Sequence, residues 1–143
     1  MALKRTGPIK RKTPMKAAQH LTQRIVKTKR AKVTAAERNA RKVVRARSGG
    51  ICEICGHAAA TNFGHRKNRS QGGQWSASNG LDLCGSGSTG CHGHATVNPA
   101  LARERGWAVL STQDPAEVPV FLAGHGWVFL LEDGSTTQQE TAA

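Results

Sequence analysis

The chain has 143 residues, with 21 Lys and Arg against 9 Asp and Glu, and a formal net charge of +12. This length allows one small domain with an appendage and excludes a large multidomain enzyme. Apolar residues make up 38% of the chain, which is enough for a modest core. The longest apolar run, Trp127–Leu131, is far shorter than the roughly 20 residues that cross a bilayer, and the first residues lack the apolar stretch of a secretory signal. We therefore expect a soluble, cytoplasmic protein with no membrane partner.

The positive charge is concentrated at the start of the chain. Residues 1–47 hold 16 of the 21 basic residues and a single acid, Glu37, which gives them a net charge of +15 and leaves −3 for the rest. Clusters of Lys and Arg release counterions from nucleic acid, so nucleic acid is the expected partner, with an acidic protein or a membrane surface as alternatives. Residues 1–33 carry two prolines and no aromatic residue, which indicates a flexible basic arm.

A basic helix is predicted next, within residues 34–50. Thr34-Ala-Ala-Glu37 is typical of a capping box, in which the threonine hydroxyl accepts from the third helical amide and the glutamate reaches back to the cap. The helix is expected to run from about Ala35 to Arg47 and to end at Ser48-Gly49-Gly50, where glycine can adopt a left-handed conformation.

Residues 51–110, rich in Gly, Cys and His, are expected to form the core of a small α+β fold. Within them, Asn98-Pro99 is predicted to open a short helix that stops at Gly106. Residues 111–132 are expected to form a small C-terminal β segment and residues 133–143 a frayed polar tail. Three strands are predicted to form a meander: Trp107–Leu110, Val118–Leu122 and Trp127–Leu131.

The four cysteines fall into two pairs, Cys52 with Cys55 in a Cys-x2-Cys sequence, and Cys84 with Cys91. In an intracellular chain this arrangement favours zinc over disulfides, because a Cys-x2-Cys turn supplies two of the four thiolates of a tetrahedral ion. The second pair is joined by a flexible Gly- and Ser-rich loop that can fold back. We predict a closed, structural four-cysteine zinc site; free thiols and a redox-active pair are the alternatives.

Histidines and basic residues lie between and beside these pairs. His65 is followed by Arg66, Lys67 and Arg69, and His92 directly follows Cys91. A phosphodiester hydrolase requires such groups, because one imidazole can activate water, cations can bind phosphate and a second imidazole can hold a divalent ion.

Residues 48–110 resemble the HNH endonuclease family, and most closely its zinc-stabilised bacteriophage type. The resemblance rests on four segments in order: Ser-Gly-Gly-Ile-Cys-Glu-Ile-Cys, His-Arg-x-x-Arg-Ser-x-Gly-Gly, Asn-Gly-Leu-x-Leu-Cys and Cys-His-Gly. It implies a ββα-metal hairpin–helix core and a metal-dependent DNA endonuclease that leaves 3′-hydroxyl and 5′-phosphate ends. It also suggests genome packaging beside a phage terminase, while restriction, mobile-element and repair roles stay open.

The resemblance also implies roles for individual residues. His65 corresponds to the general base, Asn79 to the residue that fixes the loop and orients the base, and His92 to a ligand of a catalytic divalent ion such as Mg or Mn. Gly64 and Thr96 stand where many family members carry further ligands, so His94 and Asp82 are candidate substitutes.

The basic residues after His65 have two interpretations. Arg66, Lys67 and Arg69 are candidates to bind DNA phosphates, since guanidinium groups match phosphate oxygens, or they are solvated loop residues. The alternative function for the whole chain is a noncatalytic zinc-knuckle nucleic-acid-binding protein, which would share the cysteine site and the basic arm but not the histidine chemistry.

Overall fold

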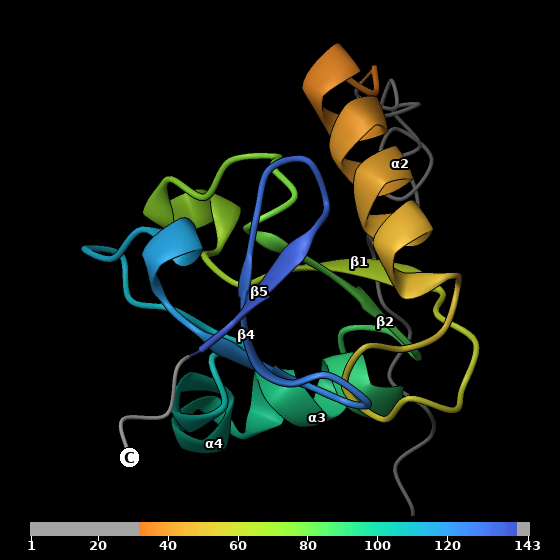
Figure 1. Cartoon of the computed structure of the whole chain (residues 1–143), viewed down its shortest axis with the longest axis vertical. Coiled ribbons are helices and arrows are strands. Elements are labelled where there is room, and N and C mark those ends of the chain that lie inside the picture. Colours follow the sequence, from red (N-terminus) through yellow and green to blue (C-terminus); the bar gives the residue numbers. More distant parts are fainter. Residues whose placement is uncertain (1–31, 140–143) are drawn as a thin grey trace, which may run out of the picture. The chain divides into compact units, whose positions relative to one another are not determined.

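A computed structural model of the chain describes residues 32–139, so the predicted flexible arm over residues 1–33 lies almost entirely outside the described part. The chain divides into two units after Lys32, and the described helices and strands belong to the second unit (Figure 1). None of the helices between residues 32 and 139 is long and apolar enough to cross a membrane.

Helix α2, Ala35–Ser48, forms where the sequence predicts it. The Thr34 hydroxyl accepts a hydrogen bond from the Glu37 amide at 3.1 Å, and Gly49 ends the helix in the left-handed conformation with φ of 60°. Only this half of the predicted capping box is formed among the described residues, because the Glu37 carboxylate accepts from Arg41 Nε at 3.0 Å instead. The Glu37–Arg41 ion pair, one turn along the helix, is formed instead of the predicted hydrogen bond between the Glu37 side chain and the backbone amide of Thr34.

The C-terminal turn of α2 is anchored by Arg47. Its guanidinium donates to both carboxylate oxygens of Glu53, at 2.7 and 3.0 Å, and to the carbonyls of Ala77 and Gly80. Both side chains of the Arg47–Glu53 pair are buried, with about 5–6% of their surface exposed. Glu53 also accepts the amide hydrogen of Asp82 at 2.7 Å, so this pair joins the helix to the strand that contains Asp82.

Strands β1, Asn62–His65, and β2, Gly80–Leu83, form an antiparallel pair in which His65 lies opposite Gly80. Helix α3, Gly90–Val97, follows β2 and contacts it, and α2 contacts the same strand. In Figure 1 this strand pair lies between α2 above and α3 below. The predicted small α+β fold is therefore confirmed, with a strand–strand–helix order over residues 62–97.

The C-terminal half differs from the prediction in one strand. Helix α4, Pro99–Glu104, and the short 3-10 helix η2, Pro115–Glu117, lead into an antiparallel sheet in the order β3-β4-β5. The bounds of its strands are Val120–Leu122 for β3, Gly126–Leu130 for β4 and Thr136–Gln138 for β5.

The predicted strand over residues 107–110 is wrong, because its polar groups have other partners. The amide of Val109 donates to the Arg66 carbonyl and the Trp107 indole donates to the Phe121 carbonyl. The third strand comes instead from the segment predicted to be a frayed tail, where Thr136–Gln138 pairs with β4. The tight turn before it is stabilised by Asp133, whose carboxylate accepts from the amide and hydroxyl of Ser135.

The core lies where the two sheets and the cysteines meet. Leu81 and Leu83 of β2 cluster with side chains of β3 and β4, and Cys52 is buried in the same cluster. Cys55, Cys84 and Cys91 are partly buried against it. This position puts the cysteine cluster at the junction of the strands and α3, where it can hold these elements together.

Candidate functional site

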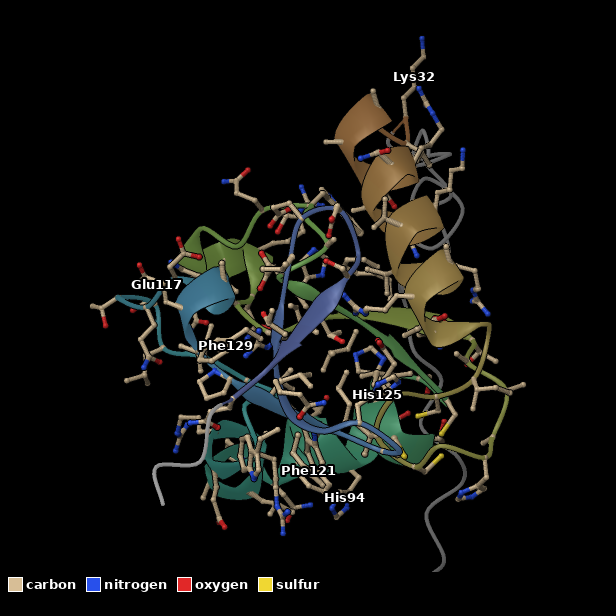
Figure 2. The ribbon with its side chains drawn as sticks, viewed as in Figure 1. Lys32, His94, Glu117, Phe121, His125 and Phe129 are labelled. Atoms are coloured by element: carbon tan, nitrogen blue, oxygen red, sulfur yellow. The ribbon has the colours of Figure 1, made fainter. Side chains whose placement is uncertain are left out.

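The four cysteines come together as predicted. Their sulfur atoms all lie within 4.8 Å of one another, and they form the one group of three or more potential metal-ligating side chains among residues 32–139. Figure 2 shows the sulfur atoms gathered beside α3. In a tetrahedral zinc site with Zn–S distances of about 2.3 Å the sulfurs are about 3.8 Å apart, so the donor set and its spacing fit such an ion.

Local backbone structure produces this cluster. Cys52 and Cys55 lie in a tight turn in which the Gly56 amide donates to the Cys52 carbonyl at 2.8 Å. The loop between the second pair folds back because Gly85 has a φ of +81° and passes so close to Thr89 that a Cβ would lie 2.1 Å from its carbonyl oxygen. Cys91 then lies in the first turn of α3, and its amide donates to the Cys84 sulfur at 3.4 Å.

The pKa values of the cysteine thiols are shifted by burial and by the close packing of the four side chains. Burial beside the other sulfurs raises the pKa of Cys91, and burial raises the pKa of Cys52. Burial also opposes ionisation of Cys55, but hydrogen bonds from the backbone of His57 and Ala58 prevail and lower its pKa to about 6. A cation among the sulfurs would favour the thiolate form of all four.

His65 and His92 line the same cavity of about 490 Å³, which opens between β1, α3, α4 and the segment after α4. His65 comes from the end of β1 and His92 from the first turn of α3. The Nε2 atom of His65 and the Nδ1 atom of His92 are buried and have no hydrogen-bond partner within the described residues. Buried imidazole nitrogens are normally satisfied, so two unpaired ones in one cavity are a feature that a ligand would explain.

The surroundings of His65 disfavour its protonation. Burial lowers its pKa, the charges of Arg69 and Arg41 lower it further, and Glu37 opposes them. Its ring packs against Trp75, with ring centroids 4.4 Å apart, and against Phe63 at 5.0 Å. The imidazole is therefore held by aromatic rings and kept neutral, which is the state in which it can accept a proton.

Asn79 is buried behind this histidine and fixes the segment that follows it. Its side-chain oxygen accepts from the Lys67 amide at 2.6 Å, and its side-chain nitrogen donates to the carbonyls of Lys67 and Gln74. The Arg66 amide also donates to the Asn79 carbonyl at 2.8 Å. These contacts hold both ends of the 67–74 segment beside His65.

Arg66 does not have the environment of a DNA-binding side chain, and this prediction is corrected. Only 1% of its surface is exposed, and its guanidinium donates to the carbonyls of Gly106, Ser78, Pro115 and Val118 at 2.7 to 3.1 Å. Burial, and then the charge of Arg47, lowers its pKa to about 10. Its donors are used inside the protein, so none is free for a phosphate.

Asp82 is also unsuited to the role of a ligand beside His92. Its carboxylate accepts from the Ser48 hydroxyl at 2.7 Å and pairs with Arg45 at 3.1 Å, on the side of β2 that α2 covers. His94 is exposed on α3 and contacts Asn98 (Figure 2). His92 is thus the one predicted catalytic ligand with a buried, unpaired nitrogen.

The two remaining basic residues of the motif differ in their contacts. The Lys67 amine donates to the Gln113 carbonyl at 3.2 Å, whereas Arg69 is exposed in the short 3-10 helix η1, Arg69–Gln71. The space beside Gly64 belongs to the core, because a Cβ there would lie 2.6 Å from a methyl carbon of Leu83. A metal-ligating side chain at position 64 would therefore require the Leu83 side chain to shift.

Sequence reasoning missed the neighbours that α2 and the 67–80 loop bring to His65. These are Glu37 and Arg41 of α2 and Trp75 of the loop. The spacing of Glu37 and Arg41 by four residues indicates their ion pair, but nothing in the sequence indicates that this face of the helix lies beside His65.

Comparisons with protein-family models, with curated proteins and with solved structures found no match.

Proposed function

We propose that this chain is a metal-dependent DNA endonuclease of the HNH type. The observation that carries the proposal is the pair of buried, unpaired imidazole nitrogens, His65 Nε2 and His92 Nδ1, that line one cavity. The order of the sequence motifs over residues 48–110 and the basic start of the chain support DNA as the substrate.

In the proposed reaction His65 accepts the proton of a water molecule whose oxygen attacks the scissile phosphorus. The bond to the 3′ oxygen breaks as the new P–O bond forms, and that oxygen takes a proton from solvent, which leaves 3′-hydroxyl and 5′-phosphate ends. The lowered pKa of His65 keeps the base neutral near pH 7. Asn79 positions it by fixing the segment that starts at Arg66.

His92 is the residue that would hold a divalent ion such as Mg or Mn. Its Nδ1 atom fits this role because it is buried and unpaired, and such an ion stabilises charge that develops on phosphate oxygens. The described residues supply no cluster of three ligands there, so water and DNA phosphate would complete the coordination. The four cysteines are proposed to bind zinc, which in a closed site serves the fold.

A plasmid-nicking assay with added Mg or Mn tests the function. We expect wild type to relax supercoiled DNA and His65→Ala to lose at least about 100-fold in rate, since general acid–base catalysis contributes roughly that much. His92→Ala should also lose activity, because it removes the proposed ligand of the divalent ion. His57→Ala and His125→Ala are matched controls, because both histidines are exposed and do not line the cavity. If wild type cleaves no faster than His65→Ala, the chain is not this enzyme.

A noncatalytic nucleic-acid-binding protein is the second candidate. The observation in its favour is Gly64, which supplies no second protein ligand where many HNH enzymes have one, and a side chain there would displace Leu83. Under this alternative the chain binds DNA with a strong salt dependence and binds zinc, but Mg or Mn produces no cleavage in the same assay.

A role in phage genome packaging beside a terminase, within the host cytoplasm, is supported by the sequence resemblance alone. Co-purification of the tagged chain with the terminase of the same phage, compared with a chain that lacks residues 1–32, tests it. Recovery of no terminase with either chain would contradict this role while leaving the proposed enzyme activity unaffected.

A further inference from the structure

Two guanidinium groups from different elements approach the same tryptophan beside His65. The Cζ atom of Arg41, on α2, lies 4.9 Å from the Trp75 ring centroid, and that of Arg69, on η1, lies 5.7 Å from it. Arg41 also lies 5.7 Å from the Phe63 ring. Cations at these distances from an aromatic ring are attracted to it, and the planar guanidinium is oriented by the contact.

Both arginines keep donors that nothing in the described chain uses. Arg41 is held by Glu37, which accepts from its Nε at 3.0 Å and pairs with one terminal nitrogen at 2.9 Å. Half of the Arg41 side chain is exposed, and its other terminal nitrogen has no hydrogen-bond partner among residues 32–139. Arg69 is exposed, and its guanidinium likewise has no such partner in that part of the chain.

The other arginines of this part of the fold do not share this arrangement. Arg47 and Arg66 donate to carbonyls and to Glu53 inside the protein, and Arg45 is paired with Asp82. Arg103 lines the cavity and is exposed, but its guanidinium lies over no aromatic ring within residues 32–139. Arg41 and Arg69 are therefore the guanidiniums that are both oriented by an aromatic ring and open to an external anion beside His65.

We propose that Arg41 and Arg69 form a clamp for the DNA phosphate backbone next to His65, with Trp75 as the positioning residue that orients both guanidiniums. Planar guanidiniums with free donors match phosphate oxygens in geometry and charge. The Trp75 ring is already in contact with both guanidiniums and with the rings of His65 and Phe63. It therefore orients side chains and does not offer a free platform for stacking bases. The clamp thus binds the backbone without reading sequence. Its ligand, DNA, rests on the proposed function.

Binding can be measured apart from cleavage. The full chain is titrated onto a fluorescently labelled DNA duplex without added Mg or Mn, over a series of salt concentrations, and a gel confirms that the duplex stays intact. The variants are Arg41→Gln, Arg69→Gln and Trp75→Leu. Arg38→Gln is the matched control, because Arg38 is an exposed arginine of the same helix that donates to the Val33 carbonyl and is not one of the two cations over the Trp75 ring.

The clamp predicts a distinct pattern. Arg41→Gln and Arg69→Gln each raise Kd by roughly tenfold, which is the loss expected for hydrogen bonds to a charged group, and each lowers the salt slope by about one. Arg38→Gln changes Kd by no more than about threefold, because an exposed charge that no aromatic ring orients is largely screened by salt. Trp75→Leu raises Kd several-fold with an unchanged salt slope, since both charges remain and only their orientation is lost.

Equal Kd values for Arg41→Gln and Arg38→Gln would overturn the clamp, as would wild-type affinity in folded Trp75→Leu. If thermal melting shows that Trp75→Leu is unfolded, Arg41→Lys replaces it: this variant keeps the charge and loses the planar fork, so a Kd equal to that of wild type contradicts the proposal. Absence of cleavage by wild type with Mg or Mn defeats the endonuclease proposal and leaves these binding results decisive for the clamp.

Discussion

At the scale of single residues, Arg66 and Arg69 show how position decides what a guanidinium does. They stand three residues apart in one motif, yet Arg66 is buried among carbonyls of three segments, and Arg69 is exposed. No carboxylate within the described residues pairs with Arg66, so carbonyl dipoles alone compensate for the loss of water around its charge. Arg66 is therefore a structural residue that ties the 67–74 segment to the C-terminal half.

Replacing Arg66 by methionine tests this role. Arg66→Met removes the donors of several buried carbonyls, and we expect the free energy of unfolding to fall by at least about 3 kcal/mol. The measurement is denaturant unfolding in buffer with zinc, with Lys67→Met as the control, because the Lys67 amine makes one exposed contact. An equal loss in the two variants would contradict the structural role.

The charges around His65 predict a pH dependence. Burial, Arg69 and Arg41 lower its pKa below the ordinary value of 6.5, so the fraction of neutral base, and with it kcat/KM, is expected to fall only at pH values below about 6.5. In Arg69→Gln a charge that opposes protonation is removed, and the acid limb of the pH–rate profile should move to higher pH. A limb that stays in place, or moves to lower pH, excludes His65 as the titrating group.

At the scale of elements, the Cys-x2-Cys turn and the start of α3 are expected to depend on the metal ion that the four cysteines are proposed to bind. Cys52→Ser is expected to release zinc and to unfold the strand pair, because a closed zinc site contributes free energy of folding directly. Zinc content by atomic absorption and far-UV circular dichroism measure both effects. His57→Ala, a change in an exposed side chain beside Cys55, is the control that should keep its zinc. Full zinc content in Cys52→Ser would refute the four-cysteine site.

Elements with strong local signals could be predicted from the sequence. Helix α2 has a side-chain cap at Thr34 and a left-handed Gly49, and the cysteine pairs have a spacing that requires a turn. The prediction of a strand over residues 107–110 was wrong, because the hydrogen-bond partners of this segment, Arg66 and Phe121, are distant in sequence. Strand β5 is polar, and it forms because β4 offers it an unpaired edge, which no local pattern reveals.

In the candidate site, too, residues marked by local motifs could be predicted, whereas residues positioned by distant contacts could not. His65, Asn79 and His92 were chosen by sequence motif, and the fold brings both histidines to one cavity with Asn79 behind the loop. The candidate roles of Arg66 in phosphate binding and of Asp82 as a ligand do not fit the structure, because the burial of these side chains depends on contacts with η2 and α2 that adjacent residues do not predict. Arg41 and Trp75 were missed, since only packing brings the helix face to the loop.

At the scale of the whole molecule, the basic residues divide into two classes. Arg45, Arg47 and Arg66 are used within the fold, so net charge overstates the positive surface of the second unit. Residues 1–32, in contrast, contain 11 Lys and Arg and no acid. Electrostatic attraction to a polyanion should come chiefly from this segment.

Deleting residues 1–32 tests whether this segment supplies most of the attraction to DNA. The deletion leaves the second unit from Val33 onward, so thermal melting should change little. The affinity for DNA should fall, and the slope of log K against log salt should become several units smaller, because each phosphate contact contributes about 0.9 to the slope. An unchanged slope would show that residues 1–32 do not contribute phosphate contacts to DNA binding.

Glu53 has a consequence for the behaviour of the whole second unit. It stands inside the Cys52–Cys55 turn, and its carboxylate holds Arg47 at the end of α2. The position of α2 and the affinity of the cysteines for a metal ion are therefore expected to be thermodynamically linked. A metal ion that orders the Cys52–Cys55 turn would strengthen the Glu53–Arg47 contact that holds α2. By reciprocity, a ligand that fixes α2 through Arg41 would raise the affinity for the metal ion by the same factor. The proposed DNA and metal ligands are thus expected to bind with positive cooperativity.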